Sequence, residues 1–136
     1  MTTEDFQAWS RFARPDQIIV DLHSPRLFDM TYIHASDIYL GDMSSQLYEF
    51  LVHPRPVAFI NAHKAVWQHD PRYAGWHLGE VADSVDEVFE AIDRAVAGHP
   101  AKAAQQEEAV RISFGSYRGA SARGAHIIAE AIQAAA

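Results

Sequence analysis

Four side chains near the middle of the chain, Asp42, Ser44, Ser45 and Glu49, have the types and spacing to hold a phosphorylated ligand. A short apolar run before them predicts a strand, and the apolar spacing after them predicts a helix. A strand-to-helix turn directs free backbone N–H groups toward one point, where serine hydroxyls can add hydrogen bonds to a phosphate. Glu49, about one helical turn further on, could then reach a ribose hydroxyl. Because Ser and Asp are also ordinary helix caps, a plain cap remains the alternative.

Two more residues are candidates for ligand contact because each follows a predicted strand. His63 comes after a continuous apolar run over 57–60 and would lie on the same side as Ser44. Asp21 lies at the C-terminal end of a second predicted strand, over 17–22, whose apolar run is Ile18, Ile19 and Val20. Open α/β sheets bind ligands at the carboxyl ends of their strands, so both positions fit a binding edge.

Metal and cofactor chemistry are not expected. The chain has eight histidines and no cysteine, and no histidine pair has the His-x-x-x-His or Glu-x-x-His spacing that builds a metal site on a helix. The chain also carries neither a phosphate-binding P-loop nor a dinucleotide fingerprint. We therefore expect no metal ligands and no bound cofactor.

Composition predicts an ordinary folded protein and excludes some partners. The 136 residues are 49% hydrophobic and 21% charged, which is typical of a chain that buries a core. The net charge is -7, and Lys64 and Lys102 are the only lysines, so binding to duplex DNA or RNA is not expected. No apolar run approaches the roughly 20 residues that span a bilayer, and the N-terminus does not read as a signal peptide. A cytoplasmic location is expected.

The order of elements predicts an α/β fold with a Rossmann-like parallel sheet of about four strands and flanking helices. We expect one domain over 1–136, with an N-terminal helix in 1–15, a β-α-β-α-β core over 17–81 with the nucleotide-type turn at 41–49, and C-terminal helices over 84–136. The strands are expected over 17–22, 38–40, 57–60 and 77–81. In the C-terminal part, Gly98 should end one helix and Pro100 should begin the next.

The central turn also resembles a known family. Asp42-Met43-Ser44-Ser45, with Tyr48 and Glu49 after it, is similar to the Asp-Tyr-Ser-Ser motif of the CDP-glycerol glycerophosphotransferases, which polymerise teichoic acids. The segment from Arg55 to Ile60 continues the likeness as an Arg-Pro pair followed by a buried strand. The close match covers residues 36–61. The order of elements agrees more loosely over 17–132.

This resemblance implies part of the C-terminal domain of a two-domain GT-B glycosyltransferase fold. By that resemblance, Asp42, Ser44 and Ser45 would hold the diphosphate of a nucleotide-activated glycerol or sugar, and Glu49 would approach its ribose. Met43 stands where the family has tyrosine. A chain of 136 residues is too short for both domains, so we expect a ligand-binding domain that is not catalytically complete alone. It would work as a homodimer or with a separate acceptor-binding domain, and would meet a membrane only through a partner.

Two functions of other classes stay open. The run from Asp21 to Pro25 looks like the phospho-acceptor segment of response-regulator receiver domains, with Asp21 as the acceptor. Receivers, however, carry paired acidic residues for Mg²⁺ after an earlier strand, and the sequence predicts no strand before Asp21. The third alternative is a structural or oligomerisation domain without a small ligand.

Overall fold

The computed structural model describes the backbone of residues 3–135 and the side chains of residues 7–135. Its contacts divide the chain into two compact units, one ending at Ser36 and the other beginning at Asp37. Each unit is described by itself below. Within the described residues, no helix combines the length and the apolar character needed to cross a membrane.

The first unit contains helices but no strand among its described residues. It consists of α1 (Thr3–Ser10), the 3-10 helix η1 (Pro25–Leu27) and α2 (Thr31–Ala35). The prediction of a strand over 17–22 is wrong: Ile18 makes a single antiparallel bridge to Arg14, and nothing extends it. An apolar run becomes a strand only where another strand pairs with it, and Ile18 and Ile19 remain 48% and 74% exposed.

The second unit is built on a small parallel sheet. Its strands are β1 (Tyr39–Gly41), β2 (Val57–Ile60) and β3 (Glu80–Ala82), which lie in the order β1-β2-β3. The register aligns Tyr39 with Val57 and Ala58 with Glu80. The mixed α/β class with a parallel sheet is confirmed, and β2 has its predicted bounds. The sheet has three strands rather than about four, because the run at 17–22 does not join it.

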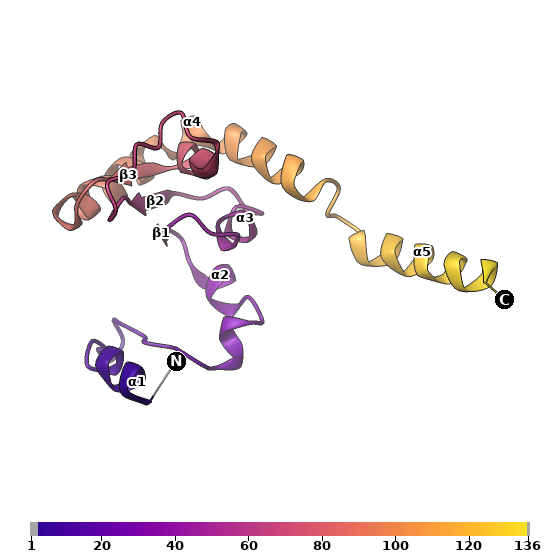
Figure 1. Cartoon of the computed structure of the whole chain (residues 1–136), viewed down its shortest axis with the longest axis horizontal. Coiled ribbons are helices and arrows are strands. Elements are labelled where there is room, and N and C mark those ends of the chain that lie inside the picture. The colour runs from indigo at the N-terminus through magenta and orange to yellow at the C-terminus, as the bar shows by residue number, and fades with distance from the viewer. Residues whose placement is uncertain (1–2, 136) are drawn as a thin grey trace. The chain divides into compact units, whose positions relative to one another are not determined.

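Helical segments follow each strand of this sheet (Figure 1). They are α3 (Gln46–Phe50), the 3-10 helices η2 (Pro71–Leu78) and η3 (Val85–Glu87), α4 (Val88–Phe114) and α5 (Ala120–Ala134). The predicted division at Gly98 and Pro100 is wrong, because α4 runs through both residues. Proline removes one hydrogen bond from a helix interior. Buried residues on both sides of it, including Ala95 and Gln106, supply the packing that keeps the helix continuous.

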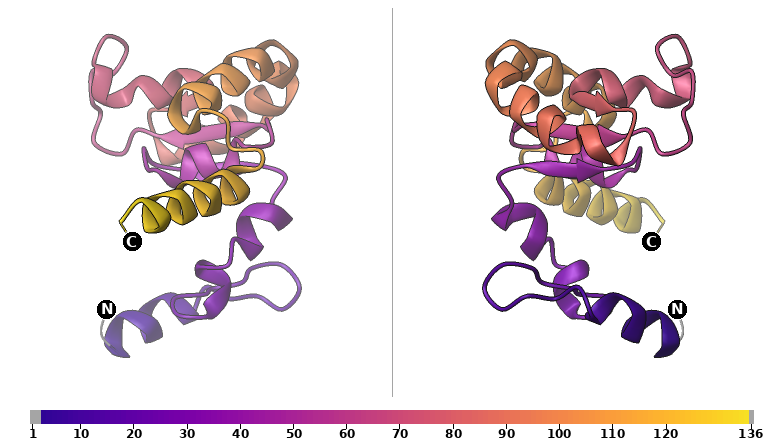
Figure 2. Two further views of the ribbon diagram at one scale, coloured as in Figure 1. Left: turned by 90° about the vertical axis from the view of Figure 1, so that its right-hand side faces the viewer. Right: turned by 90° about the vertical axis from the view of Figure 1, so that its left-hand side faces the viewer.

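Helix α4 covers one face of the sheet. Strand alternation places Ala58, Glu80 and Ala82 on the same face, and Arg94 of α4 forms an ion pair with Glu80 at 3.4 Å. Figure 2 shows α4, in salmon and orange, lying along one side of the strands. The contact is built from alanines: Ala58 and Ala82 of the sheet and Ala91 and Ala95 of α4 are all buried. Side chains this small let the helix axis come close to the sheet.

Aromatic rings fill the other face. Tyr39 of β1 contacts Phe50 of α3 at a centroid distance of 5.6 Å and Phe59 of β2 at 6.2 Å. Phe59 in turn lies 6.0 Å from Trp76 of η2. Phe50, Phe59 and Trp76 are buried. This cluster joins the turn after β1 to η2, although the two are separated by β2 in the sequence.

We expect Gly79→Ala to destabilise the second unit. A Cβ at Gly79 would come within 2.4 Å of the Val57 backbone oxygen. The segment that leads into β3 would therefore have to move away from β2. Overpacking of this kind costs about 1–3 kcal/mol in the free energy of unfolding, measured by urea denaturation. Gly98→Ala is the matched control, because a Cβ there meets no atom within 4 Å. It should stabilise α4 by about 0.5–1 kcal/mol, and equal effects of the two changes would contradict the packing described here.

Candidate functional site

The turn after β1 is tied to its own strand. The Tyr39 hydroxyl donates to the Asp42 backbone oxygen at 3.1 Å and lies 3.3 Å from Ser44 Oγ. Asp42 turns its own carboxylate back to the Met43 N–H, at 2.6 Å. Because the Tyr39 ring is held in the aromatic cluster, its hydroxyl fixes the path of the turn.

The two serines do not cap the helix with their side chains. Ser45 is the N-cap residue of α3, but its hydroxyl makes no capping hydrogen bond, and Ser44 Oγ faces Tyr39 instead. The plain-cap alternative, in which Asp42 or Ser44 caps α3, is therefore wrong. Asp42, Ser44 and Ser45 are all exposed. Their polar atoms are accessible to a ligand, although a helix of five residues contributes only a weak dipole.

A cleft of about 290 Å³ opens at the carboxyl ends of β1 and β2. Two predicted site residues, Asp42 and His63, line it. The other predicted residues of the second unit, Ser44, Ser45 and Glu49, are not part of its lining; Glu49 is half-buried within α3. The remaining walls come from the turn after β1, from the end of β2 and the loop after it, and from η2; they include Met43, Asn61, Arg72, Tyr73 and Trp76.

The turn and η2 meet directly beside this cleft. A Cβ on Gly75 would come within 2.6 Å of Met43 Cε and 2.9 Å of Leu47 Cδ2, so the ends of these two side chains pack closely against η2 and would have to move to admit a larger residue. Met43 is therefore a packing residue at the cleft wall. This contact places the aromatic residues of η2 next to Asp42.

Asn61 is the best-anchored polar residue of the cleft. It is only 3% exposed, and its amide donates to the Ala65 oxygen at 3.1 Å and to Asp83 Oδ1 at 2.8 Å. Its own oxygen accepts from the Ala65 N–H at 2.7 Å. Asn61 thus holds the loop that carries His63 and joins it to the end of β3. The sequence predicts that Asn61 follows a strand, but nothing in it indicates these three hydrogen bonds.

Arg72 brings a cation to the cleft, but its charge is largely balanced. Its Nη2 lies 2.6 Å from Asp70 Oδ2, and its Nε lies 3.1 Å from both carboxylate oxygens. These hydrogen bonds lower the pKa of Asp70 below its usual range. Asp70 also caps η2 by accepting from the Arg72 backbone N–H at 2.9 Å. The Arg72 side chain stays 84% exposed, so it can reorient toward an anionic ligand.

Tyr73 and Trp76 of η2 form the aromatic part of the cleft lining. Their ring centroids lie 4.7 Å apart, and Trp67, which is outside the lining, lies 5.7 Å from Trp76. Trp76 is buried, and its indole Nε1–H has no hydrogen-bond partner. The sequence shows these residues as an irregular aromatic-rich stretch. Their membership of the site follows only from the packing of η2 against the turn.

Asp21 belongs to the first unit and is fully engaged there. Its carboxylate accepts from the backbone N–H groups of His23 and Ser24 at 3.2 and 2.9 Å, from Ser24 Oγ, and from the Tyr32 hydroxyl at 2.5 Å. The Ser24 hydroxyl, followed by the Tyr32 hydroxyl, holds the pKa of Asp21 well below its usual range. Asp21 therefore organises a loop, and no strand precedes it among the described residues of its unit.

Comparisons with protein families, with curated proteins and with solved structures found no match. Among the described residues, no group of three or more His, Cys, Asp or Glu side chains is arranged to hold a metal ion. The proposal below therefore rests on the cleft and on the resemblance of the central turn.

We expect Asn61→Asp to destabilise the second unit strongly, although the two side chains are almost the same size. The change replaces a donor by an acceptor, which leaves the Ala65 oxygen without its donor and sets a second carboxylate against Asp83. Burying a carboxylate in this setting should cost roughly 3 kcal/mol or more in the free energy of unfolding, measured by urea denaturation. The double variant Asn61→Asp/Asp83→Asn restores one donor–acceptor pair and should recover part of the loss. Additive effects of the two changes would contradict this arrangement.

The carboxyl ¹³C titration of Asp21 should have its midpoint well below the usual value of about 3.9. Because the folded state depresses this pKa, the loop gains stability above pH 4 and loses it as the pH falls. Ser24→Ala and Tyr32→Phe should each move the midpoint upward. Thr31→Val is the control, since the Thr31 hydroxyl lowers the pKa of Asp29 instead. An Asp21 midpoint that Thr31→Val moves as much as Ser24→Ala does would refute the assignment.

Proposed function

We propose that the unit beginning at Asp37 is a binding domain for a nucleotide-activated glycerol or sugar, like the C-terminal domain of a CDP-glycerol glycerophosphotransferase. One observation carries this proposal: the turn with the family-like motif opens into a cleft at the carboxyl edge of a parallel sheet, with Asp42 and Met43 in its wall. That edge is where open α/β sheets bind their ligands. The volume, about 290 Å³, suits one part of such a ligand, with the rest lying along the exposed turn.

The chemistry around the cleft suits the parts of a nucleotide-activated alcohol. Ser44 and Ser45 offer hydroxyls that no cap uses, and Arg72 and His63 are the nearby groups able to face a diphosphate. Tyr73 supplies an aromatic surface of the kind that stacks on a base. Asp42 repels phosphate and is better placed to accept from a hydroxyl of the ribose or the glycerol. Glu49, half-buried in α3, keeps the ribose role that the resemblance implies.

The proposal includes a partner that supplies the acceptor and the catalytic groups. Helix α5 supports this part, because Ile127, Ile128 and Ile132 are each between 62% and 66% exposed and none of its residues is buried. A helix of 15 residues is marginal in water unless another surface covers its apolar face. A separate acceptor-binding domain, or a second copy of this chain, would provide that surface. Any membrane contact would come through this partner.

Calorimetric titration of the full chain with CDP-glycerol, CDP, a UDP-sugar and inorganic phosphate tests the proposal. We expect a nucleotide diphosphate to bind more tightly than phosphate, because the cleft offers both polar and aromatic contacts. Ser44→Ala/Ser45→Ala should weaken that binding by about tenfold or more, since each hydrogen bond to a charged group contributes about 1.5–3 kcal/mol. The two changes leave the core intact, because both hydroxyls are exposed.

Ser121→Ala is the matched control, since Ser121 is an exposed serine in α5. It should leave binding unchanged. Equal binding of all variants, or binding of phosphate alone, would show that the turn does not recognise a nucleotide. If none of the four ligands binds the wild-type chain, the unit is an interaction domain, and the exposed isoleucines of α5 become its principal functional feature.

A further inference from the structure

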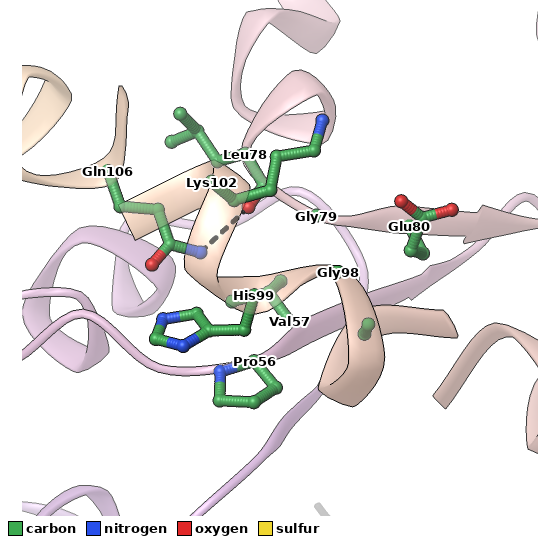
Figure 3. A pocket seen from close by; sticks show the side chains of 10 residues that line it. Pro56, Val57, Leu78, Gly79, Glu80, Gly98, His99, Lys102 and Gln106 are labelled. Atoms are coloured by element: carbon green, nitrogen blue, oxygen red, sulfur yellow. Dashed lines mark hydrogen bonds between the residues drawn. The ribbon is translucent and has the colours of Figure 1, made fainter. Parts of the chain in front are cut away.

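A second, much smaller cavity lies at the opposite edge of the sheet, where β2 and β3 begin. Helix α4 covers it, and it is lined by Val57 and Gly79 on the side of the strands and by His99 and Gln106 on the side of the helix (Figure 3). Its volume is about 10 Å³. That is about the space that a single water molecule requires, and too little for any organic ligand.

Gln106 presents an unused acceptor to this cavity. The residue is 1% exposed, and its amide nitrogen donates to the Leu78 oxygen at 2.8 Å and to the Arg55 oxygen at 3.1 Å. The opposite orientation of the amide would turn its oxygen against two carbonyl oxygens, so the hydrogen bonds fix which atom is which. The remaining atom, Oε1, is buried and has no partner.

His99 presents a second unused polar atom. Its Nε2 is buried without a partner, although the residue as a whole is half-buried. His99 and Gln106 are seven positions apart on α4, which is about two helical turns, so they lie on the same face of the helix. Figure 3 shows the imidazole and the carboxamide pointing to the same side, with Pro56 beneath them.

We propose that this cavity is the site of one internal water molecule that bridges His99 and Gln106. The water donates one hydrogen bond to Gln106 Oε1 and forms a second with His99 Nε2, so both buried atoms are satisfied. A metal cation does not suit the site, because Lys102 also lines it and carries a positive charge.

The bridge has a structural role on either side of Pro100. Pro100 has no backbone N–H, so α4 lacks the hydrogen bond that residue 100 would donate to the Val96 oxygen, whereas Gln106 holds the sheet beyond the proline. The water links the residue just before the proline to the Gln106 carboxamide, which in turn holds the chain segments that lead into β2 and β3. The water-mediated contact thus keeps both halves of α4 attached to one edge of the sheet.

Oxygen-17 relaxation dispersion of the full chain, which counts long-lived internal waters, tests the proposal. We expect His99→Phe to have one long-lived water fewer than the wild type, because an aromatic ring is kept and the polar nitrogen that binds the water is lost. His126→Phe is the matched control and should keep the wild-type count, since His126 is exposed on α5 and pairs with Glu130. An unchanged count in His99→Phe would overturn the proposal.

The wild-type chain alone provides a second test that does not depend on the folding of a variant. The carbon-bound ring protons of His99 that flank Nε2 should show a cross-peak to a long-lived water. The absence of that cross-peak, or a crystal structure with Nε2 bonded directly to Gln106 Oε1, would refute the bridge. Neither result depends on nucleotide binding at the other edge of the sheet, so the two proposals fail separately.

Discussion

Strand β2 lies between two other strands and between two packed faces, and the second unit depends on this double burial. Val57, Ala58 and Phe59 are each exposed by 1% or less. One face of β2 packs against the alanines of α4 and the other packs against the aromatic cluster. The packing on both faces therefore holds β2 in place. The close approach at Gly79 fixes its distance from the segment that leads into β3. A four-residue strand with these constraints positions everything attached to its two ends.

At each of the two ends of β2, a buried amide side chain forms hydrogen bonds that hold the neighbouring segments together. Asn61 follows the carboxyl end of β2 and joins the loop with His63 to Asp83. Gln106 reaches the amino end from α4 and satisfies the carbonyls of Arg55 and Leu78. Amides suit this task because they donate and accept at once without bringing a charge into the core. The edges differ in their openness: a ligand-sized cleft at one end, a water-sized cavity at the other.

Local sequence pattern was sufficient where one element decides its own structure. The continuous apolar run over 57–60 predicted β2 correctly, and the apolar run before Gly41 predicted β1 to within one residue. The sequence pattern failed where contacts with other segments of the chain determine the structure. The run over 17–22 has the composition of a strand but no neighbour, and Pro100 looks like a helix start until the buried residues beyond it are known. The same limit hid the cleft residues of η2, because tertiary contacts bring them to the turn: Gly75 packs against Met43, and Trp76 joins the aromatic cluster.

The structure also changes the physical basis on which the turn could recognise a phosphate. A helix dipole is a weak attraction here, because α3 has only five residues. Recognition must then come from side chains: the two serine hydroxyls, His63, and an arginine whose charge Asp70 already balances. An anion that draws Arg72 away from Asp70 exchanges one charge pair for another, so affinity for bare phosphate should be low. Selectivity would come from the aromatic wall, which favours a ligand with a base over a ligand with a phosphate alone.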